Sequence, residues 1–460
     1  MRKCLIAVLV LACAGSCQGT LAHQPAADLL GMDDFLYLGA FRLPEGEERP
    51  LTFSYGGEAM TWIPDADSPG TPDRLPGLLL IMGHNRMPYG ELPDGNQVAL
   101  VTIPAPVNSR DVEDLSRASF IGEFHSVASG YFTEYVEIPR VGMQYLDAAG
   151  GQRIHLCWGQ HFHFEDTSTA THAWFGLDLS DPGMQGPWFI GNQSLYSTNN
   201  YLFDIPVQWT QDNTGGKLLA TGRFRDGGWS GMGPALFAYS PWPDASGTPA
   251  APQTRLQETV LLLYQSSETT EDIERAMDGY QHGDEWEGGA WITTSSGKHG
   301  VLFAGTKSTG DRYWYGFINP AGSAYPCLEE EFIGEFILCR DADGTPCGNE
   351  ASWVCTEPAS GRGWWSTSFS AWFILYDPDD LASVARRDLQ PWEPQPYAHL
   401  VIDDYLFFNP SAVDTNILGT GTQRRYRIGD IAFDREHGYL YVLELFADEA
   451  QPVVHVWEIR

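Results

Sequence analysis

Basic residues are scarce in this sequence: Lys and Arg together number 27, against 60 Asp and Glu, and the formal net charge is −33 at pH 7. So acidic a surface repels phosphate groups and anionic membranes, which excludes nucleic acid as a partner. The charge is typical of a protein that stays soluble in a salty or extracellular medium, or of one that attracts cations such as Ca²⁺.

Long hydrophobic runs are also missing. No run of about 20 apolar residues occurs, so no transmembrane segment is predicted. Residues 1–22 instead match a signal peptide: Arg2 and Lys3 precede the short apolar segment 5–12, and Thr20-Leu21-Ala22 resembles a cleavage site. We therefore expect an extracytoplasmic protein, whether secreted, periplasmic or at the outer surface.

Lipoprotein processing is the alternative fate of this leader. Cys17 follows Ala14-Gly15-Ser16, and Cys13 follows Val10-Leu11-Ala12. Both sites lack the usual Leu three residues before the cysteine. A lipid anchor at Cys17 therefore remains open beside ordinary cleavage.

The cysteines contain no CxxC pair, and this argues against a zinc site. Four of them fall within one short segment, 327–355, which we interpret as a cysteine-rich insertion. In an oxidising compartment four nearby thiols predict two disulfides, and the sequence leaves all three pairings open. These cysteines are Cys327, Cys339, Cys347 and Cys355.

Established catalytic motifs are missing too: no nucleophile elbow, P-loop, dinucleotide fingerprint or HExxH occurs. Asp341-Ala-Asp343-Gly344 resembles the start of a calcium loop, but Ser352 occupies the twelfth position and excludes an EF-hand. Calcium at a looser site stays possible as a cofactor. Cys157, His161 and His163 share one side of an extended strand but lack a fourth ligand, so no metal site is predicted.

The sequence shows no long helical pattern. The best helix candidates are the short segments 270–277 and 378–387. Elsewhere short apolar runs alternate with Gly, Pro, Asp and Asn turns, and the chain is rich in Gly (49), Trp (16), Tyr (20) and Phe (23). Aromatic residues suit pleated strands and Gly suits tight turns, so an all-β fold is predicted.

One strand pattern recurs along the chain. Phe35-Leu-Tyr-Leu-Gly-Ala-Phe41 resembles segments that start roughly 65 to 80 residues apart. Between these markers lie three further strand patterns: an entry strand, a strongly apolar second strand and a third strand. The markers are 35–41, 118–124, 187–191, 259–264, 332–337 and 399–405.

Each repeat is therefore a four-stranded antiparallel meander. Such a sheet leaves its edges and one apolar face exposed, and radial repetition as a β-propeller covers them. Six markers predict about six blades in a single domain, 30–460. The chain finishes on a third strand near Ile459, so we expect the N-terminal strand at Phe35 to complete the last blade and close the ring.

Three phrases carry a resemblance to a known group. They are Leu38-Gly-Ala-Phe-Arg-Leu-Pro44, Arg223-Phe-Arg-Asp-Gly-Gly-Trp229 and Pro391-Trp-Glu-Pro-Gln-Pro-Tyr397. With them the whole mature chain resembles uncharacterised secreted proteins of environmental bacteria. The resemblance implies a shared fold and no particular chemistry.

The meander predicts where a site would form. Adjacent strands run in opposite directions, so the loop entering each first strand and the loop joining the second strand to the third lie on one face. The second-to-third loops contain His84, His161, Arg223 and Lys307. The entries to the first strands contain Tyr55, Glu58, Arg140, Asn200, Glu287, Arg427 and Asp430.

Basic groups at one mouth of an acidic propeller would attract an anionic ligand. The structural alternative is that Glu58, Glu287 and Asp430 simply pair with these cations. Two further residues of the segment Arg223–Trp229 are candidate ligand contacts. Arg225 would contact the ligand, unless it forms an internal ion pair with Asp226. Trp229 could stack on a sugar ring.

Two functions follow. The first is binding, and lyase-like cleavage, of an anionic polysaccharide: Arg223 or Arg140 would neutralise a carboxylate, His161 or His84 would be the base, and Tyr55 or Tyr201 the acid. A hydrolase would instead need paired carboxylates, Glu58 with Glu287. The second function is a non-catalytic surface propeller that binds an envelope protein through the insertion.

Overall fold

The computed structural model describes residues 28–65, 70–84, 97–131, 140–159, 168–194, 197–225, 231–242, 246–265, 275–281, 283–309, 312–313, 331–333, 336–338, 365–366, 368–419 and 421–460. The predicted leader, with Cys17, lies outside these residues. So do the four cysteines of the predicted insertion and the calcium-like segment 341–352.

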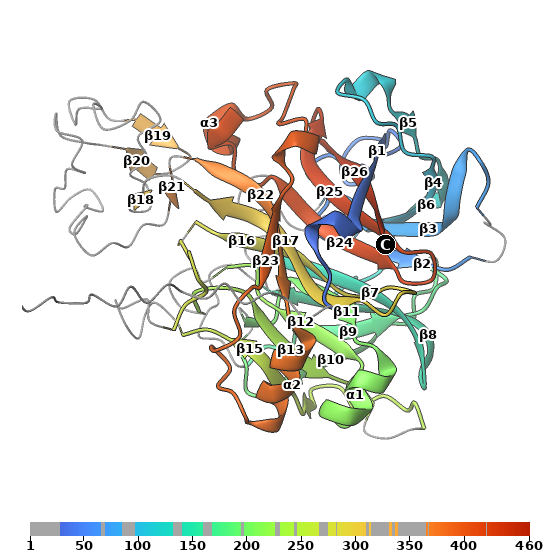
Figure 1. Ribbon diagram of the computed structural model, residues 1–460. Coiled ribbons are helices and arrows are strands. Elements are labelled where there is room, and N and C mark those ends of the chain that lie inside the picture. Colours follow the sequence, from blue (N-terminus) through green and yellow to red (C-terminus); the bar gives the residue numbers. More distant parts are fainter. Residues whose placement is uncertain are drawn as a thin grey trace, which may run out of the picture.

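The described residues form an all-β structure in which five four-stranded antiparallel sheets are arranged as a β-propeller (Figure 1). Blade 1 contains β2 (Met60–Ile63), β3 (Arg74–Met82), β4 (Gln97–Pro104) and β6 (Phe120–Ser126). Blade 2 contains β7 (Arg140–Ala148), β8 (Gly151–Gly159), β9 (His172–Phe175) and β10 (Gln185–Ile190). Blade 3 contains β11 (Tyr201–Asp204), β12 (Leu219–Gly222), β13 (Ala235–Tyr239) and β15 (Thr259–Leu263).

Blade 4 contains β16 (Glu285–Thr293), β17 (His299–Ser308), β22 (Phe369–Tyr376) and β23 (Ala398–Val401). Blade 5 contains β24 (Ile428–Asp434), β25 (Tyr439–Asp448), β26 (Gln451–Ile459) and β1 (Phe35–Arg42). Two short strands extend the blades in parallel: β5 (Ser116–Arg117) pairs with β1, and β14 (Arg255–Leu256) with β10.

The predicted number of blades, six, is wrong because one marker is not a blade strand. Its segment, 332–337, forms the hairpin β19 (Glu331–Ile333) and β20 (Phe336–Leu338). Blade 4 takes its third strand from β22. The two described residues of the expected third strand form β18 (Arg312–Tyr313), which pairs with β21 (Trp365–Ser366). An apolar segment with a central Gly suits a hairpin as well as an outer strand, so the pattern alone could not separate the two. In Figure 1 these four strands lie to the left of the blades.

The N-terminal strand belongs to the C-terminal blade. β1 pairs antiparallel with β26, from Phe35 opposite Ile459 to Arg42 opposite Val453. Figure 1 shows this blue strand against the red C-terminal strands. The first strands of the blades also contact one another in order: β2 with β7, β7 with β11, β11 with β16, β16 with β24, and β24 with β2.

Glycines allow these first strands to approach closely. A Cβ atom on Gly142 would lie 2.4 Å from the carbonyl oxygen of Asn200, and one on Gly429 would lie 2.1 Å from that of Gly57. Only glycine fits at such distances. The close approach brings β7 against the start of β11, and β24 against the residues that enter β2.

The described residues contain few helices, and all of them are short. The predicted helix at 378–387 is confirmed as α2 (Pro378–Arg386), whose N-cap is Asp377. α1 (Val207–Asn213) and the one-turn α3 (Thr415–Leu418) were not expected. Of the other predicted helix, 270–274 lie outside the described residues and 275–277 are not helical. Among the described helices, none is long and apolar enough to cross a membrane.

Candidate functional site

Two predicted catalytic residues, Tyr55 and His84, contact each other at one end of blade 1. Their ring centroids lie 6.1 Å apart in an edge-on contact. The Tyr55 hydroxyl donates to Asp414 Oδ2 at 2.7 Å, and its pKa is raised to about 12 by burial and by that carboxylate. His84 is 2% exposed, and its Nδ1 lies 2.9 Å from the carbonyl oxygen of Ser54. A carbonyl only accepts, so Nδ1 carries a proton and the neutral ring has its lone pair on Nε2.

Tyr201 occupies a different environment. It is fully buried in the core beside Phe203 and Phe303, and its hydroxyl donates to the Ala235 carbonyl oxygen at 2.6 Å. A phenol held in this way cannot reach a substrate at the mouth. We therefore leave Tyr201 out of the candidate site. Two other predicted residues, His161 and Trp229, lie outside the described residues, and Arg140 begins β7 with a side chain that the structure does not describe.

The predicted basic residues are buried and engaged within the protein. Arg223 is fully buried, and its Nε and Nη2 donate to the Gly233 carbonyl oxygen at 3.3 and 3.2 Å. Arg225 pairs with Glu285 at 3.2 Å, and Lys307 with Asp284 at 2.9 Å. The charges of Arg225 and Lys307 are compensated by acids of the protein, and Arg223 donates to a backbone carbonyl, so these side chains are engaged within the protein.

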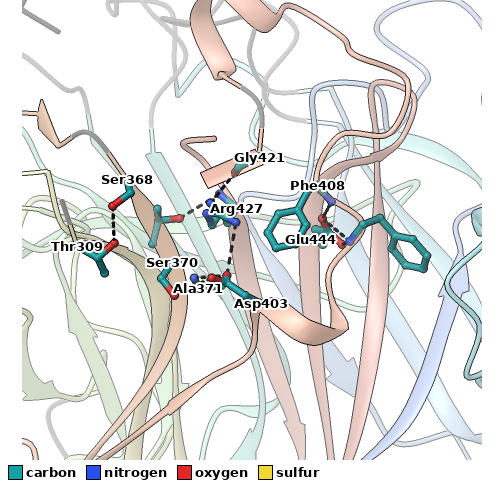
Figure 2. A network of polar contacts seen from close by, with 11 residues as sticks. Thr309, Ser368, Ser370, Ala371, Asp403, Phe408, Gly421, Arg427 and Glu444 are labelled. Atoms are coloured by element: carbon teal, nitrogen blue, oxygen red, sulfur yellow. Dashed lines mark hydrogen bonds and ion pairs between the residues drawn. The ribbon is translucent and has the colours of Figure 1, made fainter. Parts of the chain in front are cut away.

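Arg427 belongs to a polar network that holds the connection between β23 and β24 (Figure 2). Its Nη1 lies 3.4 Å from Asp403 Oδ1, and its Nη2 donates to the Gly421 carbonyl oxygen at 2.8 Å. The buried Glu444 accepts the backbone N–H groups of Phe407 and Phe408, both at 2.8 Å. The connection is thereby fixed to blade 5 at both ends.

Three carboxylates lie close to the axis on adjacent blades: Glu58 just before β2, Glu287 in β16 and Asp430 in β24. They are 3%, 1% and 1% exposed. Asp430 Oδ2 accepts the N–H of Met60 at 2.8 Å, and Oδ1 accepts that of Ile431 at 2.8 Å. Burial raises the pKa of Asp430 well above its ordinary value, and repulsion from Glu287 and Glu58 raises it further. Asp430 therefore lies near enough to Glu287 and Glu58 for their charges to act on its own.

Asn200 fixes blade 3 beside this group. Its Nδ2 donates to the carbonyl oxygens of Trp286 and Glu287 at 3.1 and 2.9 Å. Across the described ranges, no group of three or more His, Cys, Asp or Glu side chains is placed to hold a metal ion. Cys157 is buried in β8, and burial raises the pKa of its thiol.

The sequence analysis missed one part of the mouth, the segment 408–426 between β23 and β24. Phe408, Asn409, Ala412, Asp414 and Tyr426 all have positive φ angles there, from 43 to 62°. Non-glycine residues rarely adopt this conformation, and such residues often cluster at functional sites. The sequence signal was the basic run Arg424-Arg425-Tyr426-Arg427, which is unusual in so acidic a chain.

Comparison with known proteins adds no family to this geometry: no protein-family model and no curated protein matches the chain.

Proposed function

We propose that the protein binds a polysaccharide at the mouth of the propeller and cleaves its glycosidic bonds with the axial carboxylates. The observation that carries the proposal is Asp430, a buried carboxyl whose pKa is raised beside two further carboxyls, Glu58 and Glu287. Glycoside hydrolysis needs one carboxyl that is protonated and a second that is ionised. Repulsion within a group of acids separates their pKa values, so one carboxyl can hold its proton while another is ionised.

The environments suggest the roles. Asp430 is the carboxyl whose pKa is raised, so it is assigned as the general acid that protonates the leaving oxygen. Glu58 or Glu287 is assigned as the ionised carboxylate that activates water or attacks the sugar. β24 contacts β16, which carries Glu287, and β2, which Glu58 precedes, so the two elements flank the acid. The leaving oxygen takes the proton of Asp430, and water supplies the hydroxyl of the new reducing end.

Eliminative cleavage is a second candidate, supported by the contact between Tyr55 and His84. In a uronate polymer His84 Nε2 would take the proton next to the carboxylate, and Tyr55, protonated because its pKa is raised to about 12, would protonate the leaving oxygen. The product would carry a carbon–carbon double bond. This is the lyase chemistry predicted from the sequence, with Tyr55 and His84 as its residues.

Three further expectations belong to this proposal. We infer that the five blades form a closed ring, which the pairing of β1 with β26 and the contact of β24 with β2 support. The protein is proposed to be extracytoplasmic, by secretion or by lipid attachment at Cys17. The non-catalytic alternative, an envelope-protein partner bound through 327–355, predicts no turnover of any polysaccharide.

The test is the nature of the products. The full chain is incubated with a panel of neutral and uronate polysaccharides, and new reducing ends and new ultraviolet absorbance are both measured. Hydrolysis at the carboxylates predicts reducing ends without absorbance, whereas elimination predicts both together. If neither product forms from any polysaccharide of the panel, both enzymatic candidates are contradicted and the non-catalytic propeller remains.

A further inference from the structure

Arg424 is the most unusual buried charge at the mouth. The side chain is fully buried, and its Nη2 donates to the carbonyl oxygen of Leu445. Its Nε and Nη1 have no hydrogen-bond partner in the part of the chain that the structure describes. A buried guanidinium donor without an acceptor is costly, because desolvation is not repaid by a hydrogen bond. The fold therefore keeps donors at this position that no described protein atom uses.

A row of aromatic rings leads from this guanidinium to His84 at the end of β3. Arg424 lies over the Phe446 ring, with its Cζ 5.8 Å from the centroid. The Phe446 ring in turn contacts Tyr55 edge-on at 5.6 Å. The chain thus forms a row of Arg424, Phe446, Tyr55 and His84, and Tyr55 is itself held by Asp414.

The backbone is strained to place these rings. Tyr55, Tyr426 and Phe446 have φ angles of 60, 49 and 54°. Phe446 also lies in an irregularity of the pairing between β25 and β26, between Glu444 and Asp448. A bulge redirects a side chain, and bulges are common beside functional sites. The three aromatic residues belong to one hydrophobic cluster, and backbone conformations of this kind cluster at functional sites.

A purely structural role for Arg424 would be to balance the buried Glu444. The charge of Arg424 does lower the pKa of that carboxyl. However, the Glu444 oxygens are already occupied by His455 and by the N–H groups of Phe407 and Phe408. No ion pair within 4 Å joins Arg424 to Glu444 or to another described acid, so its two remaining donors are not explained by charge balance.

We propose that Arg424 binds the carboxylate of an acidic sugar, so that the substrate of the site is a uronate-containing polysaccharide. A guanidinium presents its N–H groups as a planar fork that matches a carboxylate, and the rings of Phe446 and Tyr55 supply apolar faces for the sugar. The inference rests on the proposed function and deepens it by naming the substrate class. Arg424 would then be the cation that binds the ligand, because Arg225, Lys307 and Arg427 are already paired with acids of the protein.

Binding and cleavage are measured separately to test this. The probes are an oligogalacturonate and the same oligomer with its carboxyl groups reduced to alcohols. For the wild-type chain, calorimetry is expected to give an affinity about ten- to hundred-fold higher for the acidic oligomer than for the reduced one, the value of one charge-assisted hydrogen-bond pair. Equal affinities, or no binding of the acidic oligomer, would overturn the inference without any variant.

The variant Arg424→Met then locates the carboxylate. It should lose about ten- to hundred-fold in affinity for the acidic oligomer and keep its affinity for the reduced one. Arg435→Met is the matched control, because Arg435 pairs with Asp204 just beyond the other end of β24 and should leave both affinities unchanged. If Arg424→Met binds the acidic oligomer as the wild type does, the inference fails. Binding that depends on Arg424 without cleavage would instead contradict the proposed function alone.

Discussion

The variant Asp430→Asn is expected to cleave polysaccharide at least about a hundred times more slowly than the wild type, because an amide cannot supply the proton of a general acid. The substitution keeps an oxygen in place to accept the N–H of Met60 or of Ile431. It also removes a carboxyl whose ionised form is repelled by Glu287 and Glu58. The loss should therefore appear in activity, with the fold retained by circular dichroism.

The raised pKa of Asp430 fixes the sign of two pH dependences. Catalysis needs the protonated acid, so wild-type activity should fall as the pH rises through the pKa of Asp430 in the folded protein. Stability follows the same direction, because a carboxyl with a raised folded pKa contributes its full stability below its ordinary value, about 3.9, and loses it as the pH rises. The free energy of unfolding of Asp430→Asn, minus that of the wild type, should increase from acidic to neutral pH.

Asp434→Asn is the matched control for this experiment. Asp434 is fully buried in the same strand as Asp430, but its carboxylate accepts the N–H groups of Glu436 and His437 in the turn at the opposite end of β24. Its substitution should leave the rate of cleavage unchanged. A rate for Asp430→Asn within a few-fold of the wild type would exclude Asp430 as the acid and favour Tyr55 with His84.

Local patterns predicted most strands because each blade repeats the same sequence of apolar runs and turns. The local patterns could not give the number of blades, because 332–337 has the composition of an outer strand but forms β19 and β20. Composition specifies an extended segment, whereas its partner depends on the insertion that separates β17 from β22. No periodicity in a single sequence contains that information.

For the candidate site, the sequence predicted which residues share a face but not how their side chains pair. Strand parity placed Tyr55, His84, Glu58, Glu287 and Asp430 on one face. It could not show which charge pairs with which, because pairing depends on side-chain packing: Lys307 reaches Asp284, and Arg225 reaches Glu285. Nor could it identify the mouth segment 408–426, whose positive φ angles are set by tertiary contacts such as the bond between Tyr55 and Asp414.

The pair of Lys307 and Asp284 gives the largest expected effect on stability. Lys307 Nζ donates to Asp284 Oδ1 at 2.9 Å and to the Ser308 carbonyl oxygen at 2.8 Å, and the two residues are 4% and 1% exposed. Replacing Lys307 by Met would leave a buried carboxylate without its counter-ion. Breaking a buried ion pair in this way costs about 3–5 kcal/mol, measured as the free energy of unfolding in urea.

A second substitution shows whether the buried charge is the cause. Asp284→Asn in the Lys307→Met background removes the charge and keeps an acceptor for the N–H of Ser308, which lies 2.9 Å from Asp284 Oδ1. The double variant should recover most of the lost stability. The exposed pair of Arg386 and Asp388, with side chains 50% and 67% exposed, is the control, and Arg386→Met should cost about 1 kcal/mol or less.

The pH dependence separates this mechanism from loss of packing around the lysine stem. Burial raises the pKa of Asp284, and Lys307 partly offsets the rise. Without Lys307 that pKa is higher still, so the destabilisation should be largest at neutral pH and should shrink as the pH falls toward the ordinary Asp value of about 3.9, where the carboxyl becomes neutral in both states. A loss of stability that is the same at acidic and neutral pH would mean that the lysine stem, not its charge, supports blade 4.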